Sequence, residues 1–228
     1  MEIINVKKET HDVTTITFKG TQRMSFNPGH FVMVQLLKNG KELPKRAYSI
    51  SSSPVNNETI DITVKRVHDG LISNILNEVE VGEKAIVDGP FGHLIFDPTE
   101  SKEIILLAAG CGIAPFRSFI KYIYDEKLDT KITLVYSNKT QGDIIFYNEL
   151  KELSEKMNNF DLLLTLTREE KPGFSCGRID NQMVKGIISS NKNAQYFICG
   201  SRGMANNSKK ILEENGVPKE KIRVEAYG

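Results

Sequence analysis

The hydrophobic pattern of this 228-residue chain changes its period at about Pro98. Before that residue, apolar and polar side chains alternate, as in TTITFKG (residues 14–20) and TIDITVKRV (residues 59–67). An alternation with period two is typical of strands that bury one face. After Pro98, continuous apolar runs alternate with segments whose apolar residues recur at helical spacing. Two such rhythms in one chain predict two domains of different architecture.

The first half predicts a small antiparallel barrel. Its short strands are separated by the turn signals NPG, NG, SPVNN and VG, a spacing typical of such barrels. One helix is expected over Leu71–Val79, after the turn HDG. The expected strands are Ile3–Lys8, Thr14–Gly20, His30–Leu37, Arg46–Ser51, Thr59–Val67 and Glu83–Asp88.

The second half predicts a parallel sheet covered by helices on both faces, because its strands alternate with helices along the chain. The polar stretch DPTESKE marks the boundary, so we expect domains over residues 1–98 and 99–228. The expected strands are 104–109, 131–137, 161–167, 195–200 and 222–227, and the expected helices are 115–126, 143–157, 179–190 and 204–216.

Composition argues against several classes of partner. The net charge of +1 carries no overall electrostatic footprint, so no nucleic-acid partner is expected. No apolar run reaches the ~20 residues that cross a bilayer, so no membrane span is expected. The amino terminus lacks an apolar signal region and the three cysteines are scattered, which predicts a cytoplasmic location. Neither the cysteines nor the four histidines have ligand spacing, so we expect no metal site and no iron–sulfur cluster.

The stretch LLAAGCGIAPF (residues 106–116) joins a strand to a helix through two glycines, Gly110 and Gly112. Pro115 stands where a dinucleotide fingerprint has its third glycine, and proline is well tolerated in the first turn of a helix. A helix that starts at such a turn offers free N–H groups and positive dipole character to an anion. The stretch therefore predicts a phosphate cradle, and an ordinary strand-to-helix turn remains the alternative.

A second stretch, KRAYSISSSP (residues 45–54), gathers the side chains that a flavin needs. The guanidinium of Arg46 can hold a phosphate with a fork of donors, and Tyr48 offers a flat ring for stacking. Arg46 and Tyr48 share one face of the strand, and the Ser49 hydroxyl can bond a ring nitrogen or oxygen. The alternative is an edge strand with a salt-bridging arginine.

The two stretches together resemble the signatures of the ferredoxin–NADP reductase superfamily. R-x-Y-S-x-x-S is the flavin-domain signature and G-x-G-[IV]-[AT]-P is the nicotinamide-domain signature, and both are complete here. The segment FICGSRGM matches a third pattern, a terminal Cys-Gly. The resemblance covers essentially the whole chain. It implies an antiparallel Greek-key flavin barrel followed by an α/β nucleotide-binding domain, a division that the two rhythms predict independently.

The resemblance also assigns flavin contacts. Arg46 should pair with the flavin phosphate, Tyr48 should lie against the isoalloxazine ring, and Ser49 should sit near its reactive nitrogen. The segment GLISNIL (residues 70–76) matches the pyrophosphate-binding segment, which favours FAD over FMN. Residues of TIDITVK are expected to line the flavin through backbone contacts. The flavin-binding residues expected in this way are Arg46, Ala47, Tyr48, Ser49, Ile62, Val64, Lys65, Gly70, Leu71, Ile72 and Ser73.

The same resemblance assigns the nicotinamide nucleotide. Cys199 is expected near the nicotinamide, where it positions rather than attacks; a buried small hydrophobe is the alternative. Glu225 and Tyr227 fit the E-x-Y ending of members whose tyrosine stacks on the flavin, and with Ser49 and Cys199 they are expected at the reacting centre. The expected nucleotide-binding residues are Gly110, Gly112, Ile113, Ala114, Pro115, Lys139, Arg168, Arg178, Cys199, Gly200 and Met204.

Three cations are candidates for holding the 2′-phosphate that distinguishes NADPH from NADH. Lys139, Arg168 and Arg178 each match positions where NADP-using relatives carry such residues. Two or three charge-assisted hydrogen bonds of about 1.5–3 kcal/mol each would give a clear preference. NADPH is therefore favoured, and NADH is the alternative if these residues are ordinary surface charges.

The expected activity is that of an FAD-dependent NAD(P)H oxidoreductase that passes electrons to a ferredoxin or flavodoxin. A first alternative is the reductase component or electron-transfer subunit of an oxygenase or another multi-subunit complex. A second alternative, a flavin-binding electron-transfer subunit or sensor without turnover, is disfavoured because it would not need the complete nucleotide loop. The sequence identifies neither the acceptor nor the oligomeric state.

Overall fold

The structure, a computed structural model, describes residues 1–38, 41–189 and 191–227. These residues form two compact units, Met1–Phe96 with Ala114–Asp125 and Asp97–Ile113 with Glu126–Gly228. Helix α2 (Ile113–Asp125) therefore belongs, except for its first residue, to the first unit, although the second half of the chain contains its sequence. No helix in the described part of the chain is both long and apolar enough to span a bilayer.

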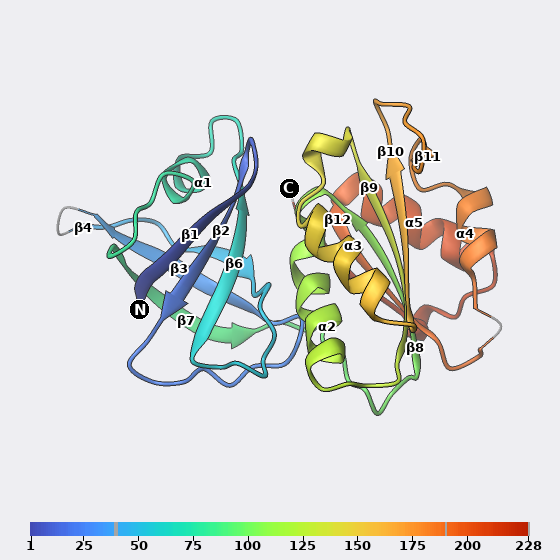
Figure 1. Ribbon diagram of the computed structural model, residues 1–228, viewed down its shortest axis with the longest axis horizontal. Helices are drawn as coiled ribbons and strands as arrows, with labels where there is room; N and C mark the ends of the chain where they lie inside the picture. Colours follow the sequence, from blue (N-terminus) through green and yellow to red (C-terminus); the bar gives the residue numbers. More distant parts are fainter. Residues whose placement is uncertain (39–40, 190, 228) are drawn as a thin grey trace. The chain divides into compact units, whose positions relative to one another are not determined.

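The first unit is built on an antiparallel sheet, which confirms the expected barrel (Figure 1). The strand order is β4-β3-β7-β1-β2-β6, and β5 pairs with β3. An isolated antiparallel bridge between Ile50 and Ile62 joins the end of β5 to β6 and closes the sheet. The elements are β1 (Glu2–Thr10), β2 (Val13–Lys19), β3 (Phe31–Lys38), β4 (Lys41–Glu42), β5 (Arg46–Ser49), β6 (Thr59–Lys65), α1 (Leu71–Leu76) and β7 (Lys84–Phe91).

The alternating pattern fills the interior of this unit. Ile16 and Phe18 of β2 and Ile60 and Ile62 of β6 are completely buried in one hydrophobic core. Helix α1 ends at Leu76 instead of the expected Val79. Its end is fixed by Asn77, whose side-chain Nδ2 donates to the carbonyl oxygens of Ser73 at 2.8 Å and Val64 at 3.2 Å. An asparagine that binds carbonyl groups in this way competes with continuation of the helix.

The second unit holds a six-stranded parallel sheet in the order β11-β10-β9-β8-β12-β13, which confirms the expected α/β architecture. Figure 1 shows α3 in front of this sheet and α5 behind it. The elements are β8 (Glu103–Ala109), a 3₁₀ turn (Gly110–Gly112), β9 (Lys131–Asn138), a 3₁₀ turn (Gln141–Asp143), α3 (Tyr147–Lys156), β10 (Phe160–Leu166), β11 (Ser175–Cys176), α4 (Asn181–Ile187), β12 (Gln195–Ser201), α5 (Arg202–Glu214), a 3₁₀ turn (Lys219–Lys221) and β13 (Ile222–Tyr227).

The helix expected over residues 143–157 begins only at Tyr147. Asp143 closes the preceding 3₁₀ turn, where its Oδ2 accepts from the backbone N–H and the hydroxyl of Thr140. Phe146 then has a left-handed backbone, with φ of 62°, which interrupts a helix. The two-residue strands β4 and β11 were not expected, because exposed pairs of residues carry no readable periodicity.

The strand order creates a topological switch point beside β8. From β8 the chain proceeds through β9, β10 and β11 on one side, and β12 and β13 then add to the other side. In open parallel sheets, ligands bind at the carboxyl ends of the strands at such a point. The turns that follow β8 and β12 are therefore where a nucleotide site is to be sought.

Candidate cofactor sites

Strand β5 presents the flavin motif on an open surface of the first unit. Arg46 and Ala47 are exposed, and Tyr48 and Ser49 are half-buried. Arg46 Nη1 donates to the Lys45 carbonyl oxygen at 2.8 Å, and no carboxylate among the described residues pairs with its guanidinium. The nearby carboxylate of Asp88 is taken instead by Lys45, at 2.5 Å. The salt-bridging role considered for Arg46 thus falls to its neighbour, and most of the guanidinium donors remain available to an anion.

The remaining flavin candidates surround this strand with different degrees of burial. The side chains of Ile62 and Val64 are completely buried in the core, so only their backbone could touch a ligand. The Lys65 ammonium lies 2.7 Å from Asp12 Oδ2. Burial alone would raise the pKa of Asp12, but hydrogen bonds from Lys65 and Thr10 outweigh it and lower the pKa below its usual value. Lys65 is thus already committed to an ion pair.

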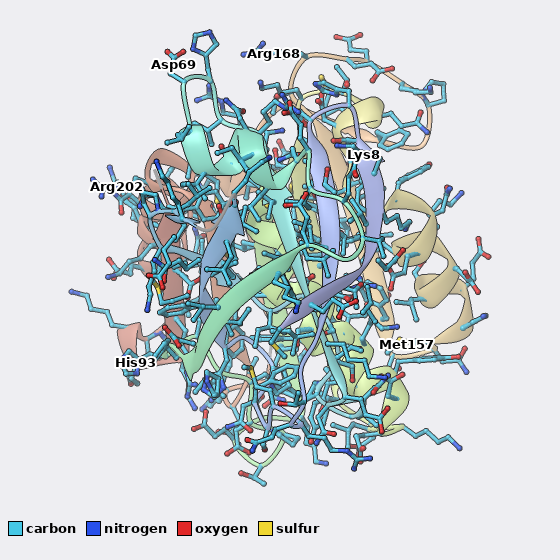
Figure 2. The ribbon with its side chains drawn as sticks, turned by 90° about the vertical axis from the view of Figure 1, so that its left-hand side faces the viewer. Lys8, Asp69, His93, Met157, Arg168 and Arg202 are labelled. Carbon is cyan, nitrogen blue, oxygen red and sulfur yellow. The ribbon has the colours of Figure 1, made fainter. Side chains whose placement is uncertain are left out.

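The segment that precedes α1 is a tight loop held by Ser73. The Ser73 hydroxyl donates to the Gly70 carbonyl oxygen and accepts from the Val67 N–H, both at 3.1 Å. This hydroxyl, expected as a ligand donor, has its proton committed to the loop. Leu71 is 63% exposed whereas Ile72 is buried. The exposed loop carries Asp69 at its tip (Figure 2).

In the second unit the Gly110–Gly112 turn lies at the switch point and presses against β12. A Cβ atom on Gly112 would lie 2.0 Å from the Cys199 carbonyl oxygen, so only glycine fits there. Gly110 has φ of 52°, a left-handed conformation that glycine adopts at no steric cost. Ile113, Ala114 and Pro115 follow as the buried first turn of α2. The turn is therefore packed directly against the end of β12, immediately before the amino end of a helix, where an anion is favoured.

Two tyrosine hydroxyls fasten this loop. Tyr136 of β9 donates to the Gly110 carbonyl oxygen at 2.8 Å, and Tyr227 donates to the Ala109 carbonyl oxygen at 3.0 Å. Burial, with a smaller contribution from the neighbouring Cys111, raises the pKa of Tyr136 well above its usual value. Tyr136 was not among the site residues predicted from the sequence. Its signal was a tyrosine inside a continuous apolar strand, where the hydroxyl must find a partner.

Three candidates for the reacting centre, Cys199, Glu225 and Tyr227, lie near the carboxyl ends of the paired strands β12 and β13. Cys199 pairs with Glu225 in the sheet register, and Ser201 pairs with Tyr227. Cys199 has no exposed surface, and burial raises the pKa of its thiol well above its usual value, helped by Glu225 and Cys111. Burial around its hydroxyl likewise raises the pKa of Tyr227, although 40% of the residue remains exposed. Both groups are therefore protonated at neutral pH.

Gly200 and Met204 complete this corner of the second unit. A Cβ atom on Gly200 would lie 3.0 Å from Met204 Sδ and 3.4 Å from the Cβ of Ala109, which shows how closely these segments approach. Ser201 caps helix α5, its Oγ accepting from the Met204 N–H at 3.5 Å. The amino end of α5 and the glycine turn after β8 thus both lie at the switch point.

The three candidate cations lie at the carboxyl ends of neighbouring strands. Lys139 follows β9, Arg168 follows β10 and Arg178 follows β11, and all three are exposed. The Arg168 N–H donates to the Lys139 carbonyl oxygen at 2.9 Å, which joins the first two segments. Arg168 lies on an exposed loop (Figure 2). The structure therefore brings these cations to one edge of the sheet.

Glu169, an acidic residue that was not predicted from the sequence, lies at the same edge. Glu169 Oε2 accepts from the Gln141 N–H at 2.7 Å, and Glu169 Oε1 lies 3.9 Å from Lys171 Nζ. A carboxylate at this edge can accept a hydrogen bond from a ribose hydroxyl, but it repels a phosphate. The cations at this edge thus suit the 2′-phosphate of NADPH, whereas the Glu169 carboxylate suits the free ribose hydroxyl of NADH.

The donor sets fit two anionic cofactors. The first unit offers the available guanidinium of Arg46 beside a half-buried tyrosine, and the second offers a glycine cradle at the switch point. These are the features required by the phosphate groups of FAD and of a nicotinamide nucleotide. No group of three or more histidine, cysteine or acidic side chains suited to a metal ion occurs among the described residues.

The burial of Cys199 predicts a slow reaction with alkylating agents. In native protein at pH 8, iodoacetamide should modify the exposed Cys176 roughly a hundredfold faster than Cys199, because the thiolate is the reactive form. The pKa of the Cys199 thiol is higher in the folded protein than in the unfolded chain. The protonated thiol therefore contributes to the free energy of unfolding at neutral pH, and this contribution is lost as the pH rises past about 9. Peptide mass spectrometry over time measures both rates, and denatured protein is the control. Equal rates in the native protein would contradict the buried-thiol interpretation.

Comparisons with known proteins agree with both halves of the structure. An oxidoreductase FAD-binding domain family matches residues 1–96, and an oxidoreductase NAD-binding domain family matches residues 106–210. The chain is 30% identical to the glycine betaine monooxygenase reductase subunit of Chromohalobacter salexigens over 99% of its own length. That match spans 63% of the relative, so the chain corresponds to less than two thirds of that protein.

Two solved structures share the fold over the full chain or nearly so. One is the FAD/NAD-binding domain of the nitric oxide dioxygenase from Vibrio cholerae, with a TM-score of 0.89, 22% identity and coverage of 100% of this chain and 97% of that one. The other is a ferredoxin NADP⁺ reductase from Neisseria gonorrhoeae with bound FAD and NADP, with a TM-score of 0.85, 22% identity and coverage of 99% and 96%. At this level of identity the likeness concerns the fold.

Proposed function

Because the chain belongs to the ferredoxin–NADP reductase superfamily and contains an FAD-binding and an NAD-binding domain, we propose that it is an FAD-dependent NAD(P)H oxidoreductase. The observation that carries the proposal is the closeness of Gly112 to the Cys199 carbonyl oxygen, which holds the glycine turn at the switch point, where open parallel sheets bind their ligands. The flavin is assigned to the barrel domain predicted over residues 1–98, and the nucleotide to residues 99–228.

A bound flavin would supply the chemistry of hydride acceptance and electron release, and the residues of the first unit would hold and orient it. Arg46 binds a flavin phosphate through its guanidinium donors, and Tyr48 lies against the ring, supported from behind by the core of the first unit. Ser49 supplies a hydroxyl near the reactive nitrogen. The backbone of Gly70 and Leu71 faces the pyrophosphate, while Ser73 keeps that loop closed.

The second unit orients the nicotinamide nucleotide. The Gly110–Gly112 turn holds the pyrophosphate, and Tyr136 keeps the turn in place through its hydrogen bond to the Gly110 carbonyl oxygen. Cys199 is completely buried and stays a neutral thiol, so it would shape the end of β12 beside the nicotinamide from within the core and would not compete as a nucleophile. Glu225 and Tyr227 remain proposed members of the reacting centre, since they lie next to Cys199 and Ser201 in the sheet.

A redox protein is the proposed electron acceptor. The sequence favoured a ferredoxin or flavodoxin, with an oxygenase system as the alternative. The similarity to the glycine betaine monooxygenase reductase subunit now supports the alternative, in which this chain is the reductase component of an oxygenase. We also propose a cytoplasmic location, because none of the three cysteines forms a disulfide bond in the described part of the chain, as is usual in a reducing compartment.

The test is a titration of purified apoprotein with FAD, followed by an NADPH oxidation assay with an artificial acceptor. We expect a yellow complex with a flavin absorption band and steady turnover. A protein that takes up FAD without oxidising either NADPH or NADH would instead be an electron-transfer subunit or sensor. Failure to take up FAD would overturn the proposal.

The proposed preference for NADPH gives a prediction at the edge of the sheet. Replacing Arg168 by alanine removes a charge-assisted contact to the 2′-phosphate, which should raise the KM for NADPH roughly ten- to a hundredfold and leave the KM for NADH nearly unchanged. Glu169→Gln should lower the KM for NADPH, because it removes a negative charge that repels the 2′-phosphate at the same edge. Steady-state kinetics with both nucleotides measures the effect. Equal losses with both would show that Arg168 is an ordinary surface charge.

A further inference from the structure

Arg117 of helix α2 makes a polar contact with the barrel of its own unit. Arg117 Nη1 donates to the Ser51 carbonyl oxygen at 2.9 Å and lies 3.1 Å from Asp61 Oδ2. The two charged side chains are only 13% and 19% exposed. A charge pair with so little solvent around it is held in a defined geometry, in contrast to a mobile pair at the surface.

The carboxylate that Arg117 contacts is itself held from other directions. Asp61 Oδ1 accepts from the Thr17 hydroxyl of β2 at 2.8 Å. The Asp61 backbone donates to Ser52 Oγ at 3.0 Å and accepts from the Ser51 N–H at 2.8 Å. Arg117 therefore completes a polar cluster that ties residues 51–52 to β6.

This cluster lies where the backbone pairing of the barrel is sparse. Strand β5 has a regular ladder with β3, but towards β6 the described backbone pairs only through the isolated bridge between Ile50 and Ile62, and a hydrogen bond between the Ser51 and Thr63 hydroxyls at 2.9 Å adds to it. The bonds that Arg117, Ser51 and Asp61 make take the place of the missing ladder. These bonds act on the residues that directly follow Tyr48 and Ser49 in the chain.

We propose that Arg117 is a positioning residue of the flavin site, which sets Tyr48 and Ser49 against the flavin ring by clamping Ser51 to Asp61. The proposal rests on the proposed function, since it takes β5 as the flavin-binding strand. It assigns a flavin-related task to a side chain that follows the nucleotide loop in sequence. A purely structural arginine would affect the stability of the barrel and leave the environment of a bound flavin unchanged.

The test compares Arg117→Met, which keeps the length of the stem but loses the charge, with Arg117→Lys, which keeps the charge but loses the fork of donors. FAD is titrated into each apoprotein, and the visible absorption and circular dichroism of the bound flavin are recorded well below the unfolding midpoint. We expect Arg117→Met to weaken FAD binding about tenfold and to shift the flavin bands. Arg117→Lys should recover part of both effects.

Arg23→Met is the matched control, because it removes an exposed arginine–glutamate pair from the same unit. It should leave FAD affinity and spectrum unchanged. If Arg117→Met does not fold, Arg117→Lys and Asp61→Asn, which weakens the clamp from the barrel side, decide the matter. Variants that fold and show wild-type affinity and flavin spectrum would overturn the proposal. Failure of wild-type protein to bind FAD would instead overturn the proposed function.

Discussion

Replacing Gly112 with alanine is expected to reduce the rate of flavin reduction by NADPH about a hundredfold, because a misplacement of about 1 Å in a reacting site has effects of that size. The added Cβ would lie 2.0 Å from the Cys199 carbonyl oxygen, and backbone on both sides of the contact must move to accept it. The nucleotide cradle and the nicotinamide position change together. Stopped-flow spectroscopy of the flavin band at saturating NADPH measures the rate. We also expect a loss of about 1–3 kcal/mol in the free energy of unfolding.

Gly186→Ala is the matched control for this substitution. It adds the same methyl group in the same unit, within helix α4, where nothing lies within 4 Å of the new atom. Its rate should equal that of the wild type, and its stability should rise slightly because alanine favours helices. A Gly112→Ala variant as fast as the control would mean that the nucleotide does not use this turn.

Replacing Arg46 with alanine is expected to weaken FAD binding roughly ten- to a hundredfold. Among the described residues the guanidinium donates to the exposed Lys45 carbonyl oxygen, so its removal leaves no buried partner unsatisfied in the free protein. The loss should therefore appear in cofactor affinity rather than in the stability of the apoprotein, at about 1.5–3 kcal/mol for a hydrogen bond to a charged group. Fluorescence titration of apoprotein with FAD measures the dissociation constant.

Arg46→Lys separates charge from geometry in the same assay. Lysine keeps the positive charge but lacks the planar fork that binds two phosphate oxygens, so its affinity should fall between wild type and alanine. Affinity should also decrease with salt, since an exposed phosphate contact is screened. Retention of full affinity by Arg46→Ala would remove Arg46 from the flavin site.

The architecture was predictable because it depends on short-range patterns. The alternation in TTITFKG and TIDITVKRV places Ile16, Phe18, Ile60 and Ile62 on one buried face, as the barrel requires. The glycine turn could also be located, since strand, turn and helix follow one another within a few residues. Prediction failed where a local conformation overrode the pattern. The expected helix over residues 143–157 included Ile144 and Ile145, yet the left-handed Phe146 delays α3 to Tyr147.

The supporting residues of the site were not predictable, because their partners are distant in the sequence. Tyr136 binds a carbonyl group 26 positions away, and Arg117 contacts residues 66 and 56 positions away. Glu169 reaches Gln141 across 28 positions. Residue type alone cannot reveal such pairs, because a tyrosine or an arginine can bind many different partners and its identity does not say which one. They emerge only when the sheet places the strands beside one another.

The membership of α2 in the first unit affects how this protein can be divided. The NAD-binding family covers residues 106–210 and so contains α2, whereas Arg117 and Phe119 of that helix contact Asp61 and Phe96 of the barrel unit. The segment that the NAD-binding family matches and the segment that packs as one compact unit therefore have different boundaries. A barrel expressed as residues 1–98 would lose this helix and expose the surface that it covers. A chimera that exchanges nucleotide domains between relatives should retain residues 114–125 of the parent that supplies the barrel.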